Sequence, residues 1–297
     1  MKIVVSGASG LIGTSLVDAL RRDGHEVARL VRREPTGPDQ VRWDPAAGRL
    51  DPEALSGADA VVHLSGAGVG DRRWTSRYQA TLIDSRVSST TTIATAAANA
   101  DKPPKTLISA SGIDAYGDRG NHEIREDEPF GSGFLADLCR VWETSTAPAE
   151  EAGIRVAHLR SGLVMGPSGG LMGRLKPLFK AGMGGRLGSG RQYWPWISLR
   201  DEVAAIQFLL TAEDVAGPVN LVGPELITNA EFTAEFARQV NRPALAPVPA
   251  FALRIALGGF ADAGILSSKR AVPGVLLDHG FEFTDATLAS ALRYSLA

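Results

Sequence analysis

An α/β fold, with a doubly wound parallel sheet and a smaller C-terminal lobe, is predicted by three observations. An apolar segment over residues 2–6 runs into glycines spaced three apart, Gly7, Gly10 and Gly13. An amphipathic helical pattern follows these glycines, and a second apolar strand over 26–31 follows the helix. The length of 297 residues permits one large core or two unequal lobes, of which we favour the second. We therefore expect strands and helices to alternate around a parallel sheet.

The glycine-rich turn between the first strand and the first helix is suited to a dinucleotide. Glycine permits a tight turn, lets backbone amides approach a pyrophosphate, and lets the helix pack closely on the strand. The helix N-terminus also offers unpaired N–H groups to the phosphates. Glycines can serve an ordinary turn instead, but the strand before them and the helix after them favour a binding loop. We expect Gly7, Ser9, Gly10 and Gly13 to lie at the cofactor.

The second strand ends at Arg32 and Arg33, and this ending indicates which dinucleotide is bound. An enzyme that uses NAD usually has a carboxylate here, which holds the ribose 2′-hydroxyl. A guanidinium suits a 2′-phosphate, because its planar fork can pair with two phosphate oxygens. The residues therefore predict NADP(H), with Arg32 at the phosphate. The alternative is that both arginines are solvated charges at the entrance of a loop.

The next buried strand continues into the small residues Ser65 and Gly66 after Leu64. Ligands of parallel sheets lie at the carboxyl ends of the strands, so we expect these three residues beside the cofactor. His63 is interpreted as a packed strand residue and not as a base, because its neighbours are buried. Arg86, in the helical pattern that follows, either turns toward the cofactor phosphates or stays in solvent.

The composition excludes several classes of function. The net charge of −2 gives no reason to expect nucleic acid or an anionic membrane as partner. Cys139 is the one cysteine, which excludes an intramolecular disulfide, and no stretch reaches the roughly 18 to 20 apolar residues of a membrane span. The five histidines are scattered, so we expect no metal site. These features predict a cytoplasmic protein that binds a small molecule, and they leave the oligomeric state open.

Short motifs along the chain carry a family resemblance: Trp43-Asp44-Pro45, Arg73-Trp74-Thr75, Ser85-Arg86, the run from Gly184 to Gln192, Trp196-Ile197, and a C-terminal signature from Val248 to Arg293. They resemble an atypical branch of the extended short-chain dehydrogenase/reductases, within the superfamily of NAD-dependent epimerases and dehydratases. Members of this branch are epimerase-like, NADP-binding oxidoreductases with a short conserved C-terminal domain. The resemblance implies cofactor contacts at Gly7, Gly10, Leu11, Ile12, Arg32, Leu64, Ser65 and Arg86.

The resemblance also implies a division of the chain. Residues 1–160 would form an NADP-binding Rossmann lobe, whose sheet is completed by later segments. Residues 161–297 would form mainly a substrate lobe, which includes the C-terminal family domain from about residue 246.

The catalytic pair usual in this superfamily is absent. That pair is Tyr-x-x-x-Lys on a helix, where the lysine adjusts the phenol to exchange a proton while a hydride moves. None of the four tyrosines is followed by lysine at the fourth position, and no lysine lies between Lys105 and Lys176. Aligning Glu143 with the superfamily's usual downstream glutamate puts Leu135 and Cys139 at the two positions. We interpret Cys139 as a buried apolar residue and not as a nucleophile.

The segment that precedes this helix resembles the strand and loop that carry the superfamily's catalytic serine. Ser111 matches that serine, and its hydroxyl could donate to a substrate oxygen. Ordinary turn chemistry is the alternative for Ser111. Tyr116 is the tyrosine close enough to act as proton donor, although packing against the nearby loop is the interpretation we favour. Asp114 is a second candidate acid or base.

The C-terminal half is expected to form the wall of the binding pocket. The resemblance implies that the backbone near Gly162 and Leu163 passes the nicotinamide. Trp194 and Trp196 follow a glycine-dense stretch and are candidate substrate contacts, with core packing as the alternative. Residues 267–270 are interpreted as a polar break before the last segment.

Two functions are consistent with these residues. The first is an NADP(H)-dependent oxidoreductase or epimerase-like enzyme of atypical mechanism that acts on a small molecule. The second is a cofactor-binding sensor or interaction protein that has lost catalysis, which the missing tyrosine and lysine would explain.

Overall fold

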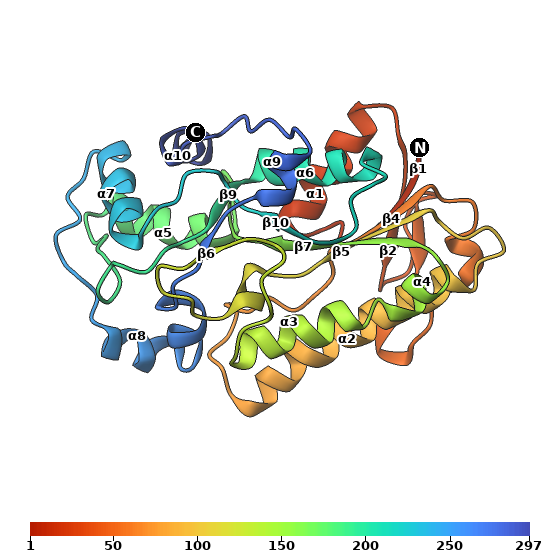
Figure 1. The fold of residues 1–297 in the computed structure, drawn as a ribbon, viewed down its shortest axis with the longest axis horizontal. Coiled ribbons are helices and arrows are strands. Elements are labelled where there is room, and N and C mark those ends of the chain that lie inside the picture. Colours follow the sequence, from red (N-terminus) through yellow and green to blue (C-terminus); the bar gives the residue numbers. More distant parts are fainter.

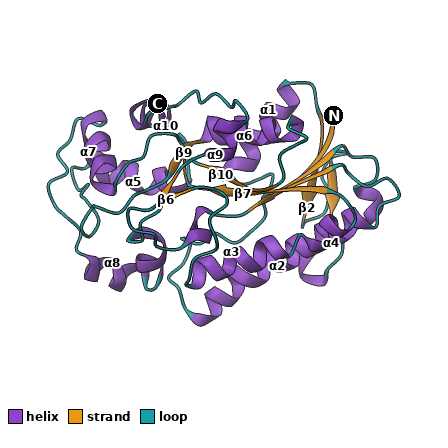
Figure 2. Cartoon of the chain, viewed as in Figure 1, coloured by secondary structure: helices purple, strands orange, loops and turns teal.

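A parallel sheet of seven strands forms the centre of the computed structural model, which describes all 297 residues. The strands are β1 (Lys2–Ser6), β2 (Glu26–Val31), β3 (Gln40–Arg42), β4 (Ala60–His63), β5 (Thr106–Ala110), β7 (Arg155–Ser161) and β10 (Gly217–Leu221). Their spatial order is β10-β7-β5-β4-β1-β2-β3, and Figure 2 shows the sheet with helices above and below it. The order reverses at β1, as in a doubly wound Rossmann sheet. The predicted fold class is confirmed.

Helices cover both faces of the sheet (Figure 1). The helices α1 (Leu11–Arg22) and α6 (Leu199–Thr211) lie on one face, and α2 (Ser76–Ala98), α3 (Phe134–Thr144) and α4 (Ala147–Glu151) lie on the other. Successive side chains of β1 point to opposite faces of the sheet and pack against the helices on each face. Ile3 and Val5 belong to the core under α1 and α6, whereas Val4 belongs to the core under α2. Such two-sided burial explains why the strands read as continuous apolar runs.

The remaining elements form a smaller lobe and the connections around it. Two short parallel sheets pair β6 (Glu123–Ile124) with β11 (Arg270–Ala271), and β8 (Leu163–Met165) with β9 (Trp196–Ser198). The helices are α5 (Gly170–Lys180), α7 (Asn229–Gln239), α8 (Ala250–Leu257), α9 (Gly274–Asp278) and α10 (Leu288–Leu296). Single turns occur at η1 (Pro45–Ala47), η2 (Pro52–Ala54), η3 (Ile113–Tyr116) and η4 (Ala261–Ile265). None of the helices is both long and apolar enough to cross a membrane.

Aromatic side chains hold the smaller lobe together. Phe179 of α5 stacks on Phe236 of α7, with 4.2 Å between the ring centroids. Trp194 packs against Phe232 at 5.4 Å, and Trp196 is buried in the same cluster. The large buried area of these rings gives the lobe an apolar core of its own beside the sheet.

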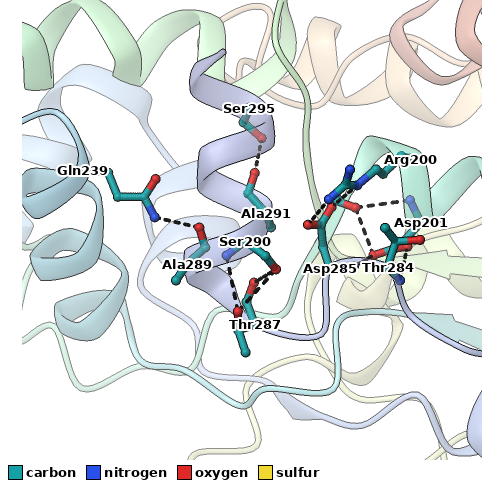
Figure 3. Close-up of polar contacts among 11 residues, drawn as sticks. Arg200, Asp201, Gln239, Thr284, Asp285, Thr287, Ala289, Ser290, Ala291 and Ser295 are labelled. Atoms are coloured by element: carbon teal, nitrogen blue, oxygen red, sulfur yellow. Dashed lines mark hydrogen bonds and ion pairs between the residues drawn. The ribbon is translucent and has the colours of Figure 1, made fainter.

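The C-terminal segment is anchored to α6 through Asp201, as Figure 3 shows. The carboxylate of Asp201 accepts hydrogen bonds from the backbone N–H groups of Thr284 and Asp285, at 2.9 and 2.8 Å. Arg200 pairs with the carboxylate of Asp285 through two guanidinium nitrogens. Asp201 is 1% exposed, so water cannot replace its oxygens as acceptors. These bonds fix the chain just before α10 begins.

Replacing Asp201 with alanine should therefore destabilise the fold. The substitution Asp201→Ala leaves the buried N–H of Asp285 and the part-buried N–H of Thr284 without an acceptor, and we expect a loss of about 2 to 3 kcal/mol in the free energy of unfolding. Asp18→Ala is the matched control, because Asp18 is an exposed helix residue. Urea unfolding followed by circular dichroism measures both variants. Equal midpoints for the two variants would contradict the anchoring role.

Candidate active site

The loop between β1 and α1 has no room for side chains at two of its glycines. Gly7 has a φ of +70°, and a Cβ there would lie 2.7 Å from the carbonyl carbon of Leu64. A Cβ on Gly13 would lie 2.2 Å from the carbonyl oxygen of Gly7. Gly10 caps α1 without a side-chain hydrogen bond, and the first turn holds no acidic residue. The helix N-terminus can therefore receive an anion.

Arg32 and Arg33 follow β2 as exposed side chains. The nearby carboxylates are engaged by other arginines: Asp39 pairs with Arg21 and Arg29, and Glu34 pairs with Arg42. The guanidinium groups of Arg32 and Arg33 therefore make no ion pair within the chain. They are available to a phosphate at this end of the sheet.

The end of β4 meets Arg86 of α2. A Cβ on Gly66 would lie 3.5 Å from the guanidinium carbon of Arg86, so the two residues are close neighbours. Arg86 is 7% exposed and stacks over the ring of Trp142 at 4.6 Å. Its Nη1 donates to the carbonyl of Leu82, while its Nε has no partner. Burial lowers the pKa of Arg86 from its ordinary value, and the negative charges of nearby groups, Asp114 among them, oppose that shift. The structure thus puts Arg86 inside the fold rather than in solvent.

His63 is buried at the end of β4, in accord with its interpretation as a packed strand residue. Its Nδ1 is hydrogen-bonded to the hydroxyl of Ser6 at 2.6 Å, and its Nε2 to that of Thr90 at 3.0 Å. Desolvation lowers the pKa of His63 to about 3, so the ring is neutral.

Ser111, just after β5, points at a buried ion pair. Its hydroxyl donates to Oε1 of Glu143 on α3, with 2.6 Å between the oxygens. Glu143 also receives two hydrogen bonds from the guanidinium of Arg160 on β7, both 2.9 Å long. All three side chains are at least nine-tenths buried. The predicted hydrogen bond from Ser111 to a substrate stays a prediction. To form it, a substrate must replace Glu143 as the acceptor of the Ser111 hydroxyl.

Tyr116 lies in η3 with its ring fully buried. Its hydroxyl donates to Oδ1 of Asn220 on β10 at 2.8 Å, and the guanidinium of Arg160 lies 4.8 Å from the ring centroid. Burial raises the pKa of Tyr116 to about 12. Both the burial and the pKa oppose the predicted role of proton donor, and favour packing.

Leu135 and Cys139 of α3 are buried at the positions where the resemblance would expect tyrosine and lysine. The Cys139 thiol contacts the carbonyl oxygen of Gly112 at 3.6 Å. Burial, with the charges of Asp114 and Glu143, raises the pKa of Cys139 to about 12. The thiol is therefore a packed group and not a nucleophile.

Lys269 lies at the candidate site, although the sequence did not indicate it. Its ammonium group lies 2.8 Å from Oδ1 of Asp114, next to Ser111 in the loop after β5. Lys269 is 3% exposed, and Ser267 and Ser268 beside it are also buried. The predicted polar break at residues 267–270 follows η4 and enters β11, and three of its four side chains are buried. Polar partners in η4 and in the loop after β5 allow this burial. No signal in the sequence connects positions so far apart.

Gly162 and Leu163 continue from β7 along the edge of the sheet. A Cβ on Gly162 would lie 2.7 Å from the carbonyl oxygen of Pro195, so this backbone is tightly packed. Beside it, the hydroxyl of Ser161 donates to Oε1 of Glu202 on α6 at 2.6 Å. Glu202 is fully buried and its Oε2 has no partner. Desolvation raises the pKa of Glu202 to about 8, so it carries a proton at neutral pH.

Trp194 and Trp196, the candidate substrate contacts, are 4% and 1% exposed. Each indole N–H donates to a backbone carbonyl, that of Ile265 for Trp194 and that of Glu225 for Trp196, both at 3.0 Å. Their polar atoms are thus satisfied within the fold, and core packing, the alternative interpretation, accounts for both. Direct contact with a substrate stays a prediction that this burial opposes. No group of three or more His, Cys, Asp or Glu side chains could hold a metal ion.

The family model described as NAD dependent epimerase/dehydratase matches residues 3–223. The chain belongs to this family. A second model, a domain of unknown function (DUF1731), matches residues 248–294. Lys269 thus comes from this second domain, whereas Asp114 comes from the epimerase/dehydratase part.

The similarity to known proteins extends over almost the whole chain. Epimerase family protein MT2273 of Mycobacterium tuberculosis is 46% identical over 293 residues, which are 99% of this chain and 97% of the relative. Human epimerase family protein SDR39U1 is 34% identical over the full length of both chains. The crystal structure of human SDR39U1 (isoform2) with NADPH has a TM-score of 0.91 and 33% identity, over 99% of each chain. A nucleoside-diphosphate sugar epimerase from Corynebacterium glutamicum has a TM-score of 0.82 and 33% identity, over 100% of this chain and 58% of that one.

The buried carboxyl group of Glu202 should make the free energy of unfolding depend on pH. The pKa in the folded state, about 8, lies above the ordinary value of 4.5. The folded state therefore binds the proton more tightly, and this contribution is full below the ordinary pKa and lost as pH rises through about 8. Glu202→Gln removes the titration, so its stability relative to the wild type should rise between about pH 5 and pH 8.

Urea unfolding at the two pH values measures this difference. Glu151→Gln is the control, because Glu151 is an exposed glutamate at the end of α4. A constant difference between Glu202→Gln and the wild type across this range would rule out a protonated Glu202.

Proposed function

We propose that the protein binds NADP(H) and catalyses hydride transfer, as an oxidoreductase or epimerase-like enzyme, on a small organic molecule. The reaction would take place at the carboxyl ends of β4, β5 and β7. The loop at the start of α1 carries the proposal, because its glycines allow a tight turn and the N-terminus of α1 has no side-chain cap, so its backbone amides can face a phosphate.

The fit of the chain to NADP(H) rests on two further observations. Arg32 and Arg33 stand free at the end of β2, where a 2′-phosphate would be held. The human relative with a TM-score of 0.91 was crystallised with NADPH. The sequence prediction of NADP(H) and this relative therefore agree.

The residues around the carboxyl ends supply what the reaction needs besides the cofactor. When bound, NADP(H) donates or accepts the hydride. The loop of Gly7 to Gly13 would hold the pyrophosphate, and the backbone at Gly162 and Leu163 would line the nicotinamide side. Arg86, buried with an unpartnered Nε, would bind an oxygen of the cofactor or the substrate. Ser111 and Asp114 are the polar groups at the end of β5.

A second function is favoured by one observation on α3. Leu135 and Cys139 are buried and cannot exchange protons, so the helix lacks the superfamily's usual catalytic pair. A sensor or interaction protein would bind NADP(H), change its partner or shape, and turn over no substrate. Turnover separates this function from the first.

Wild-type protein should oxidise NADPH in the presence of at least one carbonyl compound. We would screen benzaldehyde, diacetyl and glyceraldehyde by the loss of NADPH absorbance. Gly13→Ala should abolish this activity, because the new methyl group collides with the carbonyl oxygen of Gly7. Gly173→Ala is the matched control, since Gly173 lies in α5 with nothing near its missing Cβ. NADPH binding without turnover of any compound would favour the sensor.

Cofactor choice should depend on Arg32. Arg32→Ala should lose about 1.5 to 3 kcal/mol of NADP binding, the scale of a charge-assisted hydrogen bond, while NAD binding changes little. Calorimetry at moderate salt measures both affinities, because low salt exaggerates phosphate pairing. Arg22→Ala is the control, since this exposed arginine lies at the other end of α1. A wild type that prefers NAD, or a variant that weakens both cofactors equally, would contradict the assignment.

A further inference from the structure

A buried segment of the C-terminal domain packs against the loop that follows β5. We call residues 267–271 the strap. Its β11 pairs in parallel with β6, so that Arg270 lies opposite Glu123. The carbonyl of Ser268 accepts from the N–H of Arg119 at 2.9 Å, and the hydroxyl of Ser268 donates to the carbonyl of Gly120 at 2.7 Å. The strap is thus fixed to the loop that follows β5 by its backbone and by a serine.

Lys269 extends from the strap toward the start of that loop. Its ammonium group contacts Oδ1 of Asp114 at 2.8 Å and the hydroxyl of Ser267. The two members of the ion pair differ in exposure: the side chain of Lys269 is 3% exposed and that of Asp114 is 25% exposed. The lysine therefore lies behind the carboxylate, which faces outward.

Asp114 has one oxygen engaged and one available. Oδ1 pairs with Lys269, and Oδ2 takes part in no hydrogen bond. Asp114 lies three residues after Ser111, in the loop at the carboxyl end of β5. Arg86 from α2 and Cys139 from α3 are the other titratable groups on which its charge acts. The carboxylate therefore lies at the expected ligand edge of the sheet, among the groups of the candidate active site.

We propose that Asp114 is the proton-exchanging group of this active site and that Lys269, supplied by the C-terminal domain, is the positioning residue that holds it. The proposal rests on the proposed hydride transfer. It assigns to the domain of unknown function a part in catalysis: its strap supplies a lysine where the helix α3 has none.

The chemistry balances with one proton and one hydride. In the oxidative direction, Oδ2 of Asp114 would take the proton of a substrate hydroxyl. At the same time, the carbon that carries this hydroxyl would give up its hydrogen as a hydride to NADP⁺. The O–H and C–H bonds break and a C=O bond forms. In the reductive direction, the protonated Asp114 returns the proton to the oxygen as the carbon receives a hydride from NADPH.

A purely structural role does not explain the buried ammonium group. The strap is already held by its pairing with β6 and by the bonds of Ser268. Burying a charge costs several kcal/mol of desolvation, and an apolar side chain of similar volume often stabilises as well. A buried lysine paired with a partly exposed carboxylate is the arrangement expected where that carboxylate must keep one orientation.

Four variants test the proposal in the full-length protein loaded with NADPH. Asp114→Asn removes the proton-exchanging oxygen, Lys269→Ala removes the positioning charge, and Lys269→Arg keeps it. Arg270→Met is the matched control, because Arg270 is the neighbouring strap cation and pairs with Glu123 at 3.5 Å. The measurements are the urea midpoint, the NADPH affinity, and kcat and KM for the carbonyl compound that the wild type reduces fastest among benzaldehyde, diacetyl and glyceraldehyde.

We expect kcat to fall about a hundredfold in Asp114→Asn and at least about tenfold in Lys269→Ala, with KM and NADPH affinity changed less than about twofold. Lys269→Arg should retain more activity than Lys269→Ala, and added ethylamine should restore turnover to Lys269→Ala in a saturable manner. Arg270→Met should match the wild type.

Three results would overturn the proposal. The first is a wild-type kcat in Lys269→Ala or Asp114→Asn. The second is a loss of activity in Lys269→Ala that ethylamine does not restore and that follows a lower urea midpoint, which would make the lysine structural only. The third is a wild type that binds NADPH without reducing any of the compounds. This last result refutes the proposed catalysis itself, and the wild-type arm alone reports it.

Discussion

The ion pair between Glu143 and Arg160 is the interaction on which the packing of the candidate active site depends. It joins α3 to β7 in the interior, and a charge buried there must be paired. The guanidinium of Arg160 also lies 4.8 Å from the ring centroids of Tyr116 and Phe130. Removing either partner would leave the other charge unpaired, at a cost of about 3 to 5 kcal/mol. Ser111 joins this cluster because Glu143 accepts a hydrogen bond from its hydroxyl.

Much of the fold could be predicted because its signals are local. Gly10 and Gly13 are required by steric contacts with Gly7 in the same turn, whereas Gly7 itself packs against the backbone of Leu64. The apolar runs of the strands reflect burial on both faces of the sheet. The free guanidinium of Arg32 could also be anticipated from the absence of a carboxylate at the end of its strand.

The candidate site residues were harder to predict because their environment depends on contacts between distant segments. Tyr116 is buried with its hydroxyl bonded to Asn220 on β10, and no pattern around the tyrosine reveals this distant partner. The burial of the polar strap could not be predicted, because Lys269 and Ser268 have their partners in the loop after β5. Trp194 and Trp196 were ambiguous for a related reason: an indole serves a core or a ligand equally well, and only its neighbours decide.

The pairing of β11 with β6 has a consequence for how the protein is made. β6 is paired with no strand but β11, which lies near the end of the chain. During synthesis, the central strands can assemble before the strap has left the ribosome, since β1 to β10 precede it. The loop after β5 can pair with the strap only after the last segment has been made. Contacts between residues so far apart in the sequence form slowly during folding. An incomplete chain would thus carry the cofactor loop while β6 still lacks its partner strand.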